Sequence, residues 1–227
     1  MRQTILTAAL VAFASPLLAQ AAQQAKDNDP THKAAGGITA AGWIDRVDAK
    51  DARRGMSTSD VKFVTMGTGY HVTAGPAAIY YNPKDVAKGE YTVSATFVQT
   101  KAPMHPEAYG LFVGGSNLQD STPQYVYFLT RGDGKYFVAH MAGADRHVIV
   151  NWTESDLTKK QDEAGKQSNQ LAVRVTKDSV QFLANGKPVT AFAKADMHGF
   201  SADGQAGIRV NHNLDLHIAD FQVKKGM

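Results

Sequence analysis

Apolar and polar side chains alternate along much of this chain with the period of two residues that is typical of β-strands. The clearest case runs from Tyr91 to Phe97, where every second residue is apolar and the residues between are Thr or Ser. Shorter runs rich in apolar residues recur at Ala108–Val113, Tyr125–Arg131, Leu171–Val175 and Ile208–Val210. Strands with this alternation bury one face and expose the other. The pattern therefore predicts antiparallel sheets.

Turn residues separate the apolar runs and predict where neighbouring strands pair. Gly132–Gly134 supplies glycines for a hairpin, and a two-residue loop of Asp133 and Gly134 would place Tyr127 opposite His140. Asn185-Gly186 is the strongest signal for a type I′ turn in the chain. The apolar parity changes at Ala219-Asp220, which predicts a β-bulge.

The elements add up to roughly ten or eleven short strands and no long helix, which is typical of a closed or two-layered antiparallel fold. The charged run from Asp45 to Arg54 is expected to form a loop, and the only helix expected is a short one from Glu154 onward. The size favours an all-β, antiparallel two-sheet jelly-roll sandwich. Its predicted core contains Tyr91, Val93, Phe97, Phe128, Val173, Val175, Phe182, Ile208 and Val210.

The N-terminus carries the pattern of an export signal. Arg2 precedes an apolar run from Ile5 to Leu18 and the small-x-small sequence that ends at Ala21, so cleavage is expected after Ala21. The apolar run is shorter than the roughly 18 to 20 residues that cross a bilayer. We therefore expect a signal peptide at 1–21, a disordered polar linker at 22–41, and a single β-sandwich domain at 42–225. The mature protein is expected in the periplasm or outside the cell, without a membrane span.

Composition and charge limit the classes of binding partner that we expect. The chain has 227 residues, 43% of them hydrophobic, and 24 Lys and Arg against 21 Asp and Glu, for a net charge of +3. Such a balance, spread along the chain, does not predict binding to nucleic acid, although the pI near 9.0 points weakly the other way. There is no cysteine, so disulfides and a lipidated cysteine are excluded. The oligomeric state is left open.

No catalytic or metal signature is visible. The eight histidines lack the spacing of metal-ligand motifs. No resident cofactor is expected, although calcium is left open: Asp120, Ser121 and Thr122 carry oxygens that suit it, but the spaced acids of a twelve-residue loop are missing. Arg131-Gly132-Asp133 spells an adhesion tripeptide that a hairpin turn explains in full.

One face of the predicted sheet is rich in rings and polar tips. Aromatic rings stack on the apolar faces of sugars, and Arg and His hydrogen-bond hydroxyl groups, so such a face is suited to a glycan. The competing interpretation is that these rings simply cover a sheet face. If the face is solvated, replacing Tyr127 or His140 by Ala should cost little stability. The candidate ligand-binding residues are Tyr109, Tyr125, Tyr127, Arg131, His140, Arg209 and His212.

Four strings of sequence follow one another in a familiar order: Gly89–Phe97, Tyr109–Gly114, Asn185–Lys187 and Gly204–Val210, before a final bulged strand. This order resembles the concanavalin A-like jelly rolls, a superfamily that includes laminin G-like domains, legume-type lectins, family 16 glucanases and the 3-keto-disaccharide hydrolase group. The resemblance covers about Trp43 to Lys225. It implies fold more than function.

Departures from the enzymes of that superfamily concern the acids. Family 16 glucanases carry E-x-D-x-x-E on one strand, whereas here Glu154-Ser155-Asp156 is followed by Lys159 in a polar stretch. Of the C-terminal motif of the 3-keto-disaccharide hydrolase group, only His212 and the glycines match. We therefore expect a non-catalytic module of the cell envelope that binds a carbohydrate or small ligand. The alternative is a glycoside hydrolase of the 3-keto-disaccharide type, so whether the protein is an enzyme stays open.

Overall fold

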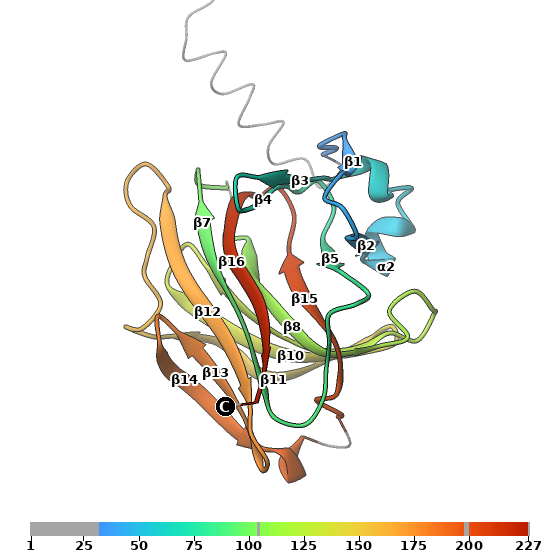
Figure 1. The fold of residues 1–227 in the computed structure, drawn as a ribbon. Helices are drawn as coiled ribbons and strands as arrows, with labels where there is room; N and C mark the ends of the chain where they lie inside the picture. Colours follow the sequence, from blue (N-terminus) through green and yellow to red (C-terminus); the bar gives the residue numbers. More distant parts are fainter. Residues whose placement is uncertain (1–31, 104, 198–199, 227) are drawn as a thin grey trace, which may run out of the picture.

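The computed structural model describes residues 32–103, 105–197 and 200–226. The predicted signal peptide and the linker up to residue 31 lie outside these residues. Over the described chain the structure is a sandwich of two sheets, 55% strand and 5% helix. In Figure 1 the strands β7, β12 and β16 lie over the strands β8, β10 and β15.

The first sheet has eight strands. In spatial order they are β1 (Gly37–Ile38), β3 (Lys62–Met66), β4 (Gly69–Thr73), β16 (Asp215–Lys225), β7 (Tyr91–Gln99), β12 (Gln167–Val175), β13 (Ser179–Ala184) and β14 (Lys187–Ala193). Only the pair β1 and β3 is parallel among the described strands.

The second sheet also has eight strands. In spatial order they are β11 (Asp145–Glu154), β10 (Lys135–Ala142), β9 (Gln124–Arg131), β8 (Ala108–Ser116), β15 (Gly204–Val210), β5 (Ala78–Tyr81) and β2 (Ile44–Val47), while β6 (Val86–Ala87) pairs with β15. The helical residues described form α2 (Ala49–Ala52) and the 3₁₀ turns Thr58–Asp60 and Lys194–Asp196. The predicted all-β, antiparallel sandwich is confirmed.

The core lies between the sheets, and all nine predicted core residues belong to it, each at most 2% exposed. Rings from opposite sheets meet there: Phe97 of β7 lies 5.2 Å from Tyr109 of β8, and Phe128 of β9 lies 5.5 Å from Phe182 of β13. The alternation in the sequence identified these positions because the sandwich buries one face of each strand.

The hairpin between β9 and β10 does not have the predicted register. Ala139, not His140, pairs with Tyr127, and His140 pairs with Val126. The loop has three residues, closed by a hydrogen bond of 3.0 Å from the Gly134 amide to the Arg131 carbonyl, with Gly134 at φ +77°. The same glycines serve a two-residue or a three-residue loop, and sequence alone did not choose between them. A slip of one residue moves every side chain of the strand to the opposite face.

The predictions of a turn at Asn185-Gly186 and of a β-bulge near Asp220 are confirmed. Asn185 and Gly186 form the two-residue loop between β13 and β14, with φ angles of 51° and 82°. The register of β16 against β7 shifts between Ala219 and Gln222, and Asp220 has φ 55°, as a bulge requires.

Three predictions about loops are wrong. The charged run from Asp45 to Arg54 is not a loop but contributes β2 and α2. No helix follows Glu154, which ends β11; the next residues form a turn, in which the Thr158 amide donates to the Ser155 carbonyl at 3.1 Å. Residues 32–41 of the expected linker are held by backbone hydrogen bonds, such as that from the Gly37 amide to the Val61 carbonyl at 2.7 Å. Backbone hydrogen bonds do not require a periodic pattern of apolar side chains, so no sign of them is visible in the sequence.

Candidate functional site

The outer face of the second sheet, which points away from the first sheet, carries a row of rings that crosses five strands. Successive ring centroids along it lie 6.1, 5.4, 5.8, 6.0 and 4.9 Å apart. Spacings of this size are those of interacting aromatic pairs. The members of this aromatic row are, in order, Tyr81, Phe112, Tyr125, Tyr127, Phe137 and Trp152.

Most of the aromatic row is buried even though it lies outside the inter-sheet core. Tyr125, Tyr127 and Phe137 are 2%, 3% and 5% exposed, and they pack with Leu129 into a second apolar cluster. Trp152, at the edge strand β11, is half-buried. The row is thus a packed floor rather than a solvated surface. The expectation that Tyr127 lies on a solvated face is therefore wrong.

Three arginines lie over rings of this row. The guanidinium carbon of Arg131 is 4.2 Å from the Trp152 ring centroid, that of Arg209 is 5.4 Å from Tyr127, and that of Arg146 is 5.9 Å from Phe137. A guanidinium within about 6 Å of a ring centroid is attracted by the ring quadrupole. The face therefore combines apolar rings with positive charge.

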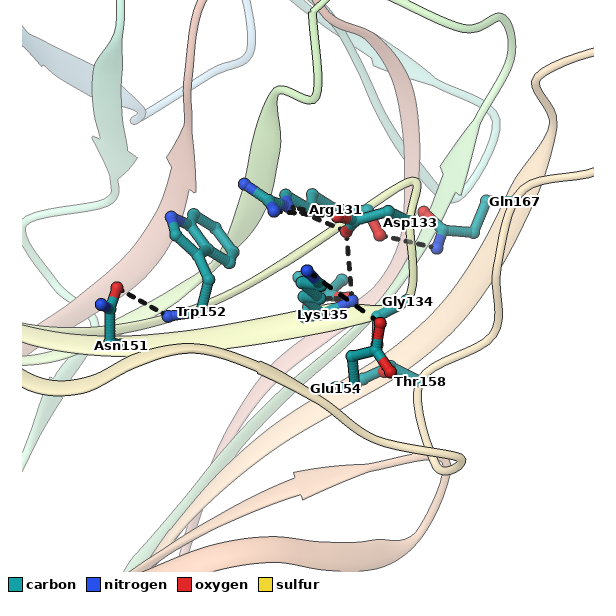
Figure 2. Close-up of polar contacts among 10 residues, drawn as sticks. Arg131, Asp133, Gly134, Lys135, Asn151, Trp152, Glu154, Thr158 and Gln167 are labelled. Carbon is teal, nitrogen blue, oxygen red and sulfur yellow. Dashed lines mark hydrogen bonds and ion pairs between the residues drawn. The ribbon is translucent and has the colours of Figure 1, made fainter.

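Arg131 is held in place by the hairpin loop that it begins. Its Nε donates to both carboxylate oxygens of Asp133 at 2.8 and 2.9 Å, and Figure 2 shows its side chain reaching toward the Trp152 indole with Asp133 beside it. Burial by itself would raise the pKa of Asp133, but the hydrogen bonds from Arg131 and from the Lys135 amide outweigh it and lower that pKa. The charged pair fixes the cation against the tryptophan.

Arg209 of β15 is fixed by Asp48, which precedes α2. The two guanidinium Nη atoms donate to the two carboxylate oxygens at 2.5 Å each, and Nη1 also lies 3.3 Å from the Tyr125 hydroxyl. Burial would lower the pKa of Arg209, but the carboxylate of Asp48 more than offsets this and raises it. Arg209 therefore stays protonated on this face.

His212 lies at the rim of the same face, on a buried carboxylate. Its Nε2 is 2.8 Å from Oδ2 of Asp51, a residue of α2 that is 1% exposed and also accepts from the Ala77 amide at 3.1 Å. Nearby, burial raises the pKa of Glu107, against the opposing influence of His212 and His105. A histidine, a buried carboxylate and a carboxyl group of raised pKa thus lie together at one end of the face.

Two cavities open on this face. The larger, of 430 Å³, is lined by Asp48, Lys50, Ala77, Tyr127, Leu129, Phe137, Arg146, Val148, Asn151, Trp152, Arg209, Asn211 and His212. The smaller, of 140 Å³, is lined by Arg46, Asp48, Ala49, Lys50, Arg53, Pro123, Tyr125, Met141, Gly143 and Ala144. Asp48 and Lys50 belong to both, so the two cavities adjoin at α2.

The structure brings five of the seven candidate residues to this face. Four of them line the cavities: Tyr125, Tyr127, Arg209 and His212. Arg131 lies over the ring of Trp152, which lines the larger cavity. Since these residues come from β9, β15 and the segment after β15, only the folded sheet assembles them.

The other two candidates lie elsewhere. Tyr109 is wholly buried in the inter-sheet core, where its hydroxyl donates to Oε1 of Gln167 at 2.6 Å. His140 lies on the same side of the second sheet as the core, with Nε2 3.0 Å from Oε1 of Gln124. The one-residue error in the predicted hairpin register explains why His140 was expected on the outer face. Phe112, not Tyr109, faces Tyr127 across β8 and β9.

Sequence reasoning missed several residues of the face. Asp48 and Lys50 were hidden in the charged run that was read as a loop. Phe112 and Phe137 are apolar residues in strands whose two faces are both buried or half-buried, so alternation did not separate them from the core. Trp152 lies in the largely exposed edge strand β11.

Metal binding has no support in the described residues, among which no group of three His, Cys, Asp or Glu side chains is placed to hold an ion. The loop suggested for calcium contacts a cation of the protein. Nη1 of Arg46 donates to the Leu118 and Asp120 carbonyls at 2.8 and 2.6 Å.

No protein-family model and no curated protein matches the sequence. Solved structures do match. The carbohydrate-binding module CBM66 from Bacillus subtilis aligns over 82% of this chain and 98% of its own, with 8% identity and a TM-score of 0.57. The laminarinase catalytic domain from Thermotoga maritima aligns over 85% and 95%, with 9% identity and a TM-score of 0.57. A GH16 protein from Bacteroides ovatus aligns over 83% and 97%, with 6% identity and a TM-score of 0.56.

The fold is a concanavalin A-like jelly roll. At such low identities these likenesses show the fold and leave the chemistry to the residues of this chain. Within the residues that the structure describes, no helix is long and apolar enough to cross a membrane.

Proposed function

We propose that the outer face of the second sheet binds a saccharide and that the protein is a non-catalytic binding module. The observation that carries the proposal is the 430 Å³ cavity, whose lining includes three members of the aromatic row, Tyr127, Phe137 and the half-buried Trp152. Ligand sites are typically concave and apolar with a few polar groups that fix orientation. A sugar has an apolar ring face for Trp152 and hydroxyl groups for the polar rim.

The rim supplies hydrogen-bonding groups of the kind that hydroxyl groups need. Asn151, Asn211 and His212 line the cavity beside Trp152, and the Trp152 amide is itself bound to the Asn151 side chain at 2.8 Å. The similar structures include a protein described as a carbohydrate-binding module, which agrees with this use of the fold.

The carboxylates favour binding over hydrolysis. Glycoside hydrolysis commonly uses two carboxyl groups that flank the scissile bond. Of the residues that line the larger cavity, only Asp48 carries a carboxylate, and both of its oxygens accept hydrogen bonds from Arg209. A carboxylate held in this way is poorly placed to serve as a nucleophile or as a general acid.

One observation favours a second candidate, a hydrolase of the 3-keto-disaccharide type. Glu107, whose pKa is raised by burial, lies near His212, which rests on the buried Asp51. Such a pair could exchange protons with a substrate. A hydrolysis screen on oxidised disaccharides tests this candidate, with His212→Gln as the variant that should abolish product formation. No turnover by the wild type would rule it out.

Binding itself is tested on a glycan array followed by titration of the oligosaccharides that are retained. Trp152→Ala should abolish retention, and a cooperative urea unfolding transition should show that the variant remains folded. The matched control is Phe221→Ala, which removes a half-buried ring from the first sheet and should leave retention intact. An empty array for the wild type, or equal loss in both variants, would refute the proposal.

We also infer that the protein is exported, to the periplasm or beyond, on the evidence of the N-terminal sequence pattern. N-terminal sequencing of the mature protein should begin at residue 22. A chain isolated from the cytosol with Met1 in place would contradict the inference.

A further inference from the structure

Positive charge is concentrated around the two cavities of the outer face. Their lining includes five cations and a single carboxylate, although the whole chain has 24 basic and 21 acidic residues. The excess is therefore local, and the near-balanced composition conceals it. The five cations are Arg46, Lys50, Arg53, Arg146 and Arg209.

The acids near the cavities are already engaged. Asp48 gives both oxygens to Arg209, and Asp51 is buried beneath His212 and also accepts from Arg54 at 3.5 Å. Arg209 is thereby neutralised, while the four other cations have no carboxylate partner among the lining residues.

The unopposed cations surround the place where the cavities adjoin. Lys50 is exposed on α2 and lines both, and Arg146 is exposed on β11 over the Phe137 ring. Arg46 is anchored by two backbone carbonyls, which position its charge without cancelling it. A cleft lined by charge of one sign raises the local concentration of ligands of the opposite sign.

We propose that the saccharide bound on this face is anionic, with its carboxylate or sulfate group at Lys50 and its ring in the larger cavity beside Trp152. This inference rests on the proposed function and adds the class of ligand to it. Carboxylates and sulfates both present oxygens that Lys and Arg bind through charge-assisted hydrogen bonds. The rings supply stacking, and the cations supply preference for a charged sugar over a neutral one.

The experiment uses matched pairs of oligosaccharides that differ only in charge. Hexagalacturonate is compared with its fully methyl-esterified form, and κ-carrageenan hexasaccharide with its neutral desulfated form, by titration with the full-length mature protein at low and high salt. One anionic member should bind roughly tenfold more tightly than its neutral partner, and added salt should remove most of that difference. The two pairs distinguish a carboxylate from a sulfate ligand.

Variants locate the effect. Lys50→Gln and Arg146→Gln should each lower affinity for the anionic member roughly two- to fivefold, as expected for an exposed ion pair, and leave the neutral member unaffected. Lys187→Gln removes an exposed charge from β14 of the other sheet and should change neither. Unchanged unfolding midpoints establish that the variants are folded.

The remaining outcomes overturn the inference in different ways. If a pair binds equally with and without charge, the ligand is not anionic, and the proposed saccharide site stands. If no member of either pair is bound, and the glycan array is also empty, both proposals fail. If oligothymidylate binds more tightly than every oligosaccharide, the cations serve a nucleic acid and the inference is wrong.

Discussion

The Arg209 guanidinium donates two hydrogen bonds of 2.5 Å to the Asp48 carboxylate. This ion pair links β15 to the residue that precedes α2. The side chain of Arg209 is 6% exposed and that of Asp48 is 25% exposed. This ion pair holds α2, which carries Lys50 and Asp51, against the outer face of the second sheet. The polar rim of the candidate site therefore depends on contacts between residues far apart in the sequence, among them this ion pair and the contact of His212 with Asp51.

Asp48→Ala should destabilise the protein strongly because it leaves the buried Arg209 charge without a partner. We expect a loss of roughly 3 to 5 kcal/mol in the free energy of unfolding, measured by urea titration. The double variant Asp48→Ala with Arg209→Met should recover much of that loss, since no unpaired charge remains. A double variant no more stable than Asp48→Ala would contradict this account of the pair.

Tyr127 separates the packing of the aromatic row from its use in binding. Tyr127→Ala should cost roughly 3 to 5 kcal/mol of unfolding free energy, as truncation of a buried aromatic does, because Tyr127 is 3% exposed. Tyr127→Phe keeps the ring and should retain most of the stability and ligand retention. The finding that would overturn the packed-floor description is a Tyr127→Ala protein as stable as the wild type.

His140 should make stability depend on pH. Burial, followed by repulsion from His147, lowers the pKa of His140 below its ordinary value of 6.5. Between the lowered pKa and 6.5 the unfolded chain binds more protons than the folded one, so stability is fully present above 6.5 and falls as the pH drops through that window. Burial likewise lowers the pKa of His71, so the two histidines act in the same direction.

The measurement is the urea midpoint from about pH 8 to about pH 5, the range in which histidine titrates. His140→Gln should flatten part of the decline, and His140→Gln with His71→Gln more of it. His105→Gln, at an exposed loop position, is the control and should follow the wild-type curve. Identical slopes for all four proteins would show that these two histidines do not cause the decline.

Gly134 tests the three-residue loop that sets the hairpin register. A Cβ at this position would lie 2.7 Å from Cγ of Lys160, whereas a Cβ at Gly186 would meet nothing within 4 Å. The φ angles of +77° and +82° impose the same backbone penalty, about 1 to 2 kcal/mol, on an alanine at either site. Gly134→Ala should therefore be the more destabilising of the two by thermal unfolding. The reverse order would contradict the observed loop.

The alternation of apolar and polar residues was sufficient to predict the class of fold and the inter-sheet core. Tyr91, Val93 and Phe97 sit in β7 at the middle of the first sheet, where a strand buries one face and the period of two is undisturbed. The bulge at Asp220 and the turn at Asn185 were likewise predictable from the sequence. The parity of apolar positions and the residue types of a turn are local properties of the chain.

The outer face of the second sheet was only partly predictable. Along β8 and β9 both faces are buried, so Tyr109 and Tyr127 look alike in the sequence, although one lies in the core and the other beneath the cavity. His140 was placed on the wrong face because one extra loop residue reverses every side chain of β10.

By itself, then, the sequence determined most of the strand segments, where two of the turns and the bulge lie, and nine of the side chains that fill the space between the sheets. Each of these follows from residues close together in the chain. The tertiary structure alone decided which rings share a face, that Asp48 is neutralised by Arg209 while Asp51 is buried beneath His212, and where the remaining cations gather. Those relationships depend on contacts between segments that are far apart in the sequence. Such contacts form only when the packing of the whole chain has fixed which strands pair.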